Sequence, residues 1–140
     1  MNKLLFTVLI VLFASACGTD NIDRTLQFSA GQTLALYHSV RDMPGRLPRS
    51  TNENGKLVTS DDAYWCSGFT AGTLWYLYEY TGCDSLKIAA ETLTGRIERQ
   101  QYTTDNHDVG FMINCSYGNG WRLTENPGYR DVIVNAARSL

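Results

Sequence analysis

Apolar residues recur with a period of about 3.6 in several stretches of the chain, which is the spacing of one buried face of an α-helix. No stretch shows the alternation of a β-strand with comparable support, so the predicted fold class is all-α. Five helices are predicted from the pattern, at about residues 24–41, 67–80, 85–97, 108–117 and 127–140.

Residues that favour helix ends support three of these boundaries. Gly82 follows the second helix, at the position where a left-handed C-terminal cap is common. Asp84 or Ser85 is expected to cap the third helix. The fifth has the clearest start, because Asn126 suits a cap and Pro127 suits the first helical position.

Two polar stretches are predicted to be irregular. Residues 42–63 contain two of the three prolines and several turn formers, and are expected to form a loop. The stretch "CSYGNGWRL", residues 115–123, is expected to leave the fourth helix in a tight turn, because Gly118 and Gly120 tolerate unusual backbone angles. This turn either lines a site or simply connects two helices.

The first 17 residues have the pattern of a secretory signal: Lys3, an apolar stretch from Leu4 to Phe13, and small residues before Cys17. The ending "ASAC" resembles a bacterial lipobox, in which the cysteine becomes the lipid-modified first residue. We therefore expect an exported protein, a periplasmic or outer-membrane lipoprotein of a Gram-negative bacterium, anchored through Cys17. The alternative is a simple cleavable signal. Residues 18–140 are expected to form the folded part.

Composition narrows the choice of partners. The net charge is −2 and no basic cluster is present, so a nucleic-acid partner has no electrostatic support. Outside the signal, Cys66, Cys83 and Cys115 are an odd number without metal-ligand spacing. Since they lie among apolar residues, we expect small buried hydrophobic side chains rather than disulfides or metal ligands.

The adjacent pair His107–Asp108 is the first candidate for chemistry. A carboxyl group held near a histidine and aromatic rings can act as an acid, because desolvation favours its protonated form. The simpler alternative is that Asp108 caps the fourth helix. Trp65 is the second candidate, since it directly precedes a helix and its ring could lie at the mouth of a cavity. The alternative for Trp65 is that its ring packs in the core. Core packing is the favoured role for Trp75.

Four segments, in this order and spacing, resemble the unsaturated glucuronyl hydrolases, glycoside hydrolase family 88. The resemblance covers nearly all of the chain after the signal. A minor departure is Ala71, where many members have proline. The segments are "LPRS" (47–50), "WCSGFTAGTLWYLYEYTG" (65–82), "NHDVGFMINCSYGNGWRLT" (106–124) and "YRDVIVNAARSL" (129–140).

The resemblance implies an (α/α)6 barrel, of which this chain supplies about the first five helices. It also implies hydrolysis of oligosaccharides that end in a 4,5-unsaturated uronic acid, with no metal and no organic cofactor. A carboxylic acid protonates the vinyl ether of the substrate, and water then adds to it. Asp108 matches one of two key aspartates of the family, His107 a pocket histidine, and Trp65 a tryptophan that stacks on the sugar.

Length is the main departure from the family, whose members are more than twice as long. The resemblance implies that the second aspartate of the family, its principal proton donor and water activator, belongs downstream of Leu140, and Asp131 does not match its motif. We therefore expect an N-terminal part of such an enzyme that is inactive alone. The alternative is a truncated, non-catalytic remnant or a sugar-binding lipoprotein.

Overall fold

The computed structural model describes the backbone of residues 3–139 and the side chains of residues 20–139. Cys17 therefore lies outside the described side chains. No helix in the described part is both long and apolar enough to span a membrane. The structure is mostly helical, as predicted. Its elements are α1 (Lys3–Val40), β1 (Leu47–Thr51), β2 (Leu57–Ser60), α2 (Phe69–Thr81), α3 (Asp84–Gly95), the 3₁₀ helix η1 (Glu98–Tyr102), α4 (Val109–Ile113), the π-helical turn η2 (Asn114–Gly118), α5 (Asn119–Thr124) and α6 (Pro127–Ser139).

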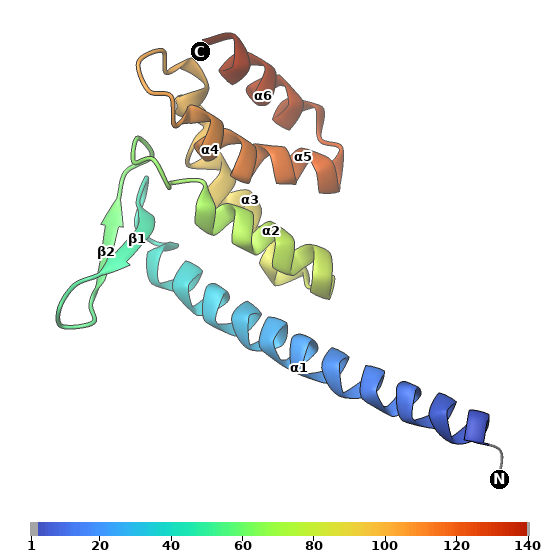
Figure 1. Cartoon of the computed structure of the whole chain (residues 1–140). Helices are drawn as coiled ribbons and strands as arrows, with labels where there is room; N and C mark the ends of the chain where they lie inside the picture. The colour runs from blue at the N-terminus through green and yellow to red at the C-terminus, as the bar shows by residue number, and fades with distance from the viewer. Residues whose placement is uncertain (1–2, 140) are drawn as a thin grey trace.

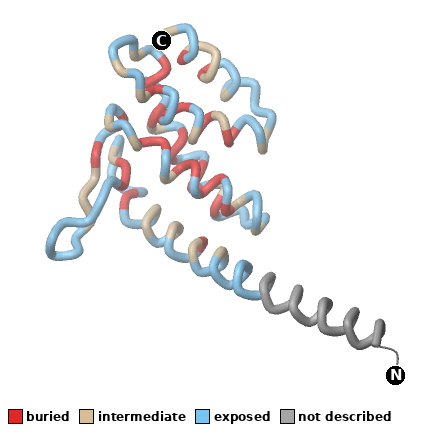
Figure 2. Tube along the Cα trace, viewed as in Figure 1, coloured by how far each residue is buried: buried red, intermediate tan, exposed pale blue. Residues whose placement is uncertain are grey.

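The helices alternate in direction. Figure 1 shows α2 and the continuous helix α4–η2–α5 running the same way, while α6 returns in the opposite direction beside α5. Helix α3 packs against α2, and α1 contacts both of them. The buried residues lie where these helices face one another, while the β-hairpin is mainly exposed (Figure 2).

The core is built around Trp75 of α2. Its ring is fully buried, and its Nε1–H donates a hydrogen bond of 3.0 Å to Oγ1 of the buried Thr94. The predicted core role of Trp75 is therefore confirmed. The predicted stripe of the third helix is also confirmed, because all five members are buried: Leu86, Ala89, Ala90, Leu93 and Ile97.

Two of the predicted helix ends are confirmed and one is wrong. Gly82 has φ 67° and donates its N–H to the carbonyl of Tyr78, which ends α2. Oδ1 of Asn126 accepts the N–H of Gly128 at 3.0 Å, and α6 begins at Pro127. Helix α3, however, begins one residue earlier than predicted, since Cys83 occupies the cap position and makes no side-chain cap bond.

The predicted turn at residues 115–123 is wrong, because this stretch is helical throughout. Gly120 serves helix packing rather than a turn: a Cβ at this position would lie 2.8 Å from Cε2 of Tyr129. The polar residues are satisfied within the helix. Ser116 donates to the carbonyl of Met112 at 2.6 Å, and Asn119 donates to the carbonyl of Cys115 at 3.0 Å.

Residues 42–63 include an antiparallel hairpin that was not predicted. Oδ1 of Asn52 accepts the N–H groups of Asn54 and Lys56 at 3.0 and 2.9 Å, and Gly55 has φ 71°. These features close the turn between β1 and β2. Both strands are short, and neither alternates buried with exposed residues: β1 passes from two buried to three exposed residues, and β2 is half-buried up to its last, buried residue. They therefore lack the alternating pattern by which a strand is recognised.

Arg96 fixes the hairpin and α1 to the helical layer. Its guanidinium donates to the carbonyls of Val40, Arg41 and Arg46, at 3.0, 2.7 and 2.6 Å. The C-terminal carbonyls of a helix have no partner within that helix, so these bonds stabilise the end of α1.

The cysteine prediction is correct only in part. The thiols of Cys66, Cys83 and Cys115 are free, as predicted, but none of the three residues is fully buried and Cys83 is exposed. Partial burial raises the pKa of the Cys115 thiol, so this side chain stays protonated at neutral pH.

Candidate active site

The candidate residues lie on the two segments that lead into α2 and α4. These parallel helices approach so closely that a Cβ on Gly68 would lie 2.8 Å from the carbonyl carbon of Met112. A Cβ on Gly72 would lie equally close to the carbonyl oxygen of Cys115. Glycine at both positions therefore lets the N-terminal ends of the two helices lie side by side.

The carboxylate of Asp108 is not used to cap its helix. Asp108 occupies the cap position of α4, yet its side chain makes no cap hydrogen bond. Its own N–H is instead bonded to Oδ1 of Asn106 at 2.9 Å. The side chain of Asp108 is 25% exposed, and its Oδ1 lies 3.4 Å from Nε2 of the exposed His107. The carboxylate is thus held at the surface without a structural role in the helix.

Trp65 is not a core residue, since 46% of its surface is exposed. Its ring meets the ring of Phe69 edge-to-face at 5.5 Å between centroids, and Phe69 meets Phe111 at 6.3 Å. Phe111 follows Asp108 by three residues, which places it one turn further along the same helix face. A row of exposed aromatic rings therefore leads from Trp65 to the helix that begins after Asp108.

A cavity of about 500 Å³ adjoins this row between α2 and η2–α5, and Phe69 forms part of its wall. Tyr76, Asn114 and Arg122 also line it. Arg122 pairs with both carboxylate oxygens of Glu79, at 2.6 and 2.8 Å. These hydrogen bonds lower the pKa of Glu79. The cavity thus combines aromatic rings with amide and guanidinium groups, which is a composition that suits a sugar.

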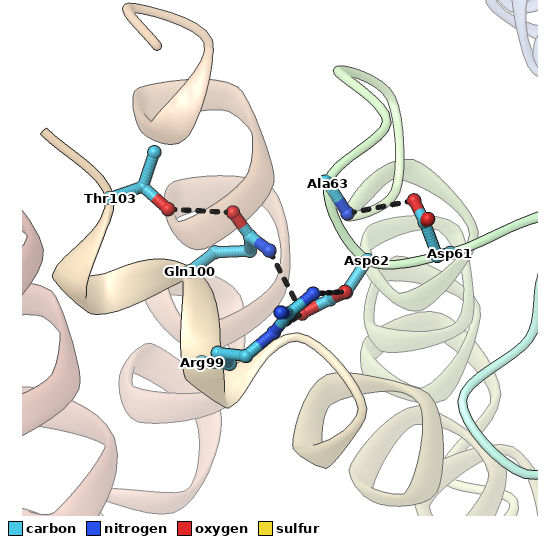
Figure 3. Close-up of polar contacts among 6 residues, drawn as sticks. All are labelled: Asp61, Asp62, Ala63, Arg99, Gln100 and Thr103. Atoms are coloured by element: carbon cyan, nitrogen blue, oxygen red, sulfur yellow. Dashed lines mark hydrogen bonds and ion pairs between the residues drawn. The ribbon is translucent and has the colours of Figure 1, made fainter. Parts of the chain in front are cut away.

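The two segments that carry the candidates are tied together by Asp62 (Figure 3). This buried carboxylate accepts hydrogen bonds from Nε of Arg99 at 3.0 Å and from Nε2 of Gln100 at 2.8 Å. The amide oxygen of Gln100 accepts the hydroxyl of Thr103 at 2.8 Å. Asp62 precedes Trp65 by three residues and Thr103 opens the segment to Asp108, so this cluster joins the two segments.

We expect the Asp62 cluster to make stability depend on pH. The hydrogen bonds from Arg99, the largest cause, and from Gln100 hold the pKa of Asp62 below its ordinary value, although burial opposes them. Because the folded state holds the proton less tightly, this contribution to stability is present at neutral pH. It is lost as the pH falls below the ordinary carboxyl pKa and through the lowered pKa of Asp62. Urea unfolding should show a smaller loss of stability on acidification in Asp62→Asn than in the parent.

The matched control for this prediction is Asp61→Asn, which removes a neighbouring, exposed carboxylate. Asp61→Asn should lose as much stability as the parent when the pH is lowered. Equal pH dependence in the parent and Asp62→Asn would contradict the assigned role of Asp62.

Three aromatic residues of the candidate site were not predicted from the sequence: Phe69, Tyr76 and Phe111. Phe69 and Tyr76 could have been found from a second stripe of residues along α2. Phe69, Thr73, Tyr76 and Tyr80 are spaced by three or four residues and all are exposed, on the face opposite the buried stripe. An aromatic stripe on the exposed face of an amphipathic helix indicates a surface meant for a ligand or another part of the protein.

Comparison with known proteins identifies related molecules, although no family model matches the chain. The unsaturated glucuronyl hydrolase of Formosa agariphila is 39% identical over 77 residues, which are 54% of this chain and 19% of that protein. The enzyme of the same name from a Bacillus species is 30% identical over 119 residues, which are 81% of this chain and 31% of its length.

Among solved structures, an unsaturated glucuronyl hydrolase specific for heparin superposes with a TM-score of 0.73 and 36% identity. The match covers 84% of this chain and 32% of that one. It confirms that the helices form part of an α/α barrel. The chain thus spans between 19% and 32% of the length of these three proteins.

Proposed function

Since the chain is homologous to part of the unsaturated glucuronyl hydrolases, we propose that it supplies one wall of the active site of such an enzyme. The substrate is an oligosaccharide that ends in a 4,5-unsaturated glucuronic acid, released by a polysaccharide lyase from a glycosaminoglycan. The observation that carries this proposal is the carboxylate of Asp108, which is free of any capping role beside a row of exposed aromatic rings.

In the proposed reaction, the two kinds of side chain have separate tasks. The flat ring of Trp65 packs against the C–H face of the unsaturated sugar and fixes its orientation. The proton for C4 of the vinyl ether comes from the second aspartate, which the rest of such an enzyme would supply, and the carboxyl group of Asp108 acts beside it on the reacting sugar. His107 hydrogen-bonds to polar groups of the sugar. Water adds its oxygen at C5 and returns one proton to the carboxylate that protonated C4. The hydroxyl proton of the resulting hemiketal then passes on as the ring opens, and the neighbouring sugar leaves as an alcohol. None of these steps requires electron transfer.

A chimaera tests the proposal. Residues 20–139 would replace the corresponding segment of the heparin-specific relative, so that the remaining helices and the second aspartate come from that protein. We expect the chimaera to consume an unsaturated disaccharide, followed by loss of the ultraviolet absorbance of its double bond. A folded chimaera that binds the disaccharide without consuming it would instead favour a sugar-binding role for the chain.

A further inference from the structure

Arg49 stands at an irregularity in the hairpin. Pro48 pairs with Thr59 and Ser50 pairs with Val58, so the ladder leaves Arg49 between two consecutive pairs without a partner of its own. Such a β-bulge turns a side chain away from the direction that a regular strand would give it. The residue is exposed, and its segment "LPRS" is one of those that carry the family resemblance.

The bulge directs the guanidinium of Arg49 towards the candidate site. Its central carbon lies 4.3 Å from the centre of the Tyr64 ring, and that ring lies 6.1 Å from the ring of Trp65. Arg49 therefore extends the exposed aromatic row at the end opposite to Phe111. A ligand that stacks on Trp65 and continues along the row reaches a positive charge.

The donors of Arg49 are free within the described part of the chain. Arg41, Arg99 and Arg122 each form an ion pair with a carboxylate. Arg46 and Arg96 donate to backbone carbonyls. Among residues 20–139, no side chain or carbonyl accepts a hydrogen bond from the guanidinium of Arg49, whose position is fixed by the ring of Tyr64. A planar guanidinium with free donors suits an anion with two oxygens in reach.

We propose that Arg49 determines substrate specificity by binding a sulfate group on the sugar that follows the unsaturated uronic acid. The inference rests on the proposed function, because it takes the terminal ring to lie on Trp65. The carboxylate of the uronic acid belongs to that ring. The anion that binds to the guanidinium of Arg49, beyond Tyr64, must therefore belong to the next sugar, and we take it to be an ester sulfate.

Calorimetric titration of the full chain tests this inference with two probes. One is an unsaturated disaccharide with a sulfate on its second sugar, and the other is the same disaccharide without sulfate. We expect the parent to bind the sulfated probe about tenfold more tightly than the unsulfated one, because a hydrogen bond to a charged group changes affinity by about tenfold. Arg49→Ala should lose this preference. Arg49→Lys should keep part of the preference, because it retains the charge but not the planar fork.

The matched control is Arg130→Ala, which removes the same charge from an exposed position on α6. It should bind both probes like the parent. An unchanged preference in Arg49→Ala would overturn the role of Arg49, and so would an equal loss of affinity for both probes. Failure of the parent to bind either probe would contradict the proposed function itself, and with it the inference.

Discussion

Asp108→Asn should lower the rate of disaccharide hydrolysis by about a thousandfold in the chimaera, because a neutral amide cannot replace the carboxyl group that acts on the reacting sugar beside the proton-donating second aspartate. The substitution keeps the size of the side chain. It removes no cap hydrogen bond, since Asp108 makes none, and the contact with His107 lies at the surface. The fold should therefore be preserved, and the Michaelis constant should change much less than the turnover number. Steady-state kinetics on the unsaturated disaccharide measures both.

Asp131→Asn provides the matched control for this loss. Asp131 is an exposed carboxylate on α6, outside the site. Its replacement should leave the rate within about twofold of the parent, as expected for a surface change. A similar fall in both variants, or a loss in Asp108→Asn that follows a loss of folded protein in circular dichroism, would contradict the catalytic role of Asp108.

Trp75→Ala should destabilise the folded chain by about 3–5 kcal/mol, the usual cost of removing a buried tryptophan. The ring is fully buried and packs edge-to-face near Tyr78 and Tyr129, at 6.2 and 6.4 Å between centroids. The substitution also leaves the buried hydroxyl of Thr94 without the donor that now bonds to it. The free energy of unfolding of a small domain is only about 5–15 kcal/mol, so this substitution would remove a large part of it.

Urea unfolding followed by circular dichroism measures this effect, with Trp121→Ala as control. Trp121 has the same side chain, but 42% of its surface is exposed. Its removal should cost clearly less than that of Trp75, because a large part of its surface is already in water and no closed cavity is left behind. Equal destabilisation in the two variants would show that the core is not centred on Trp75.

The helices of this fold were predictable because each buries one apolar stripe. Leu86 and Ile97 mark the two ends of such a stripe on the third helix and its flank, and both are fully buried. The end of α2 at Gly82 and the start of α6 at Pro127 followed from local backbone chemistry, which does not depend on the rest of the fold.

The errors arose where tertiary contacts decide the local structure. Gly118 and Gly120 favour a turn when considered alone, but Gly120 is needed where the helix packs on Trp75 and Tyr129. The hairpin was missed because its pairing depends on a turn around Asn52 and on contacts with α1, not on a strand-like pattern.

The candidate site was predictable only in its chemistry. Trp65 and Asp108 could be proposed from residue type and from the family resemblance, but they are 43 positions apart in the sequence. What places them on adjacent helix ends is the close approach at Gly68 and the bonds around Asp62. Both are long-range contacts that leave no periodic signal in the sequence.

We propose that the exposed aromatic row and the carboxylate of Asp108 form one sugar site. The most direct test of this claim is a titration of the isotope-labelled chain with an unsulfated unsaturated disaccharide, followed by amide chemical shifts in nuclear magnetic resonance spectra. We expect the shifts to change in residues 64–69 and 107–111 and to stay constant along α6. Changes confined to α6, or no change at any residue when the disaccharide is in large excess, would contradict the claim.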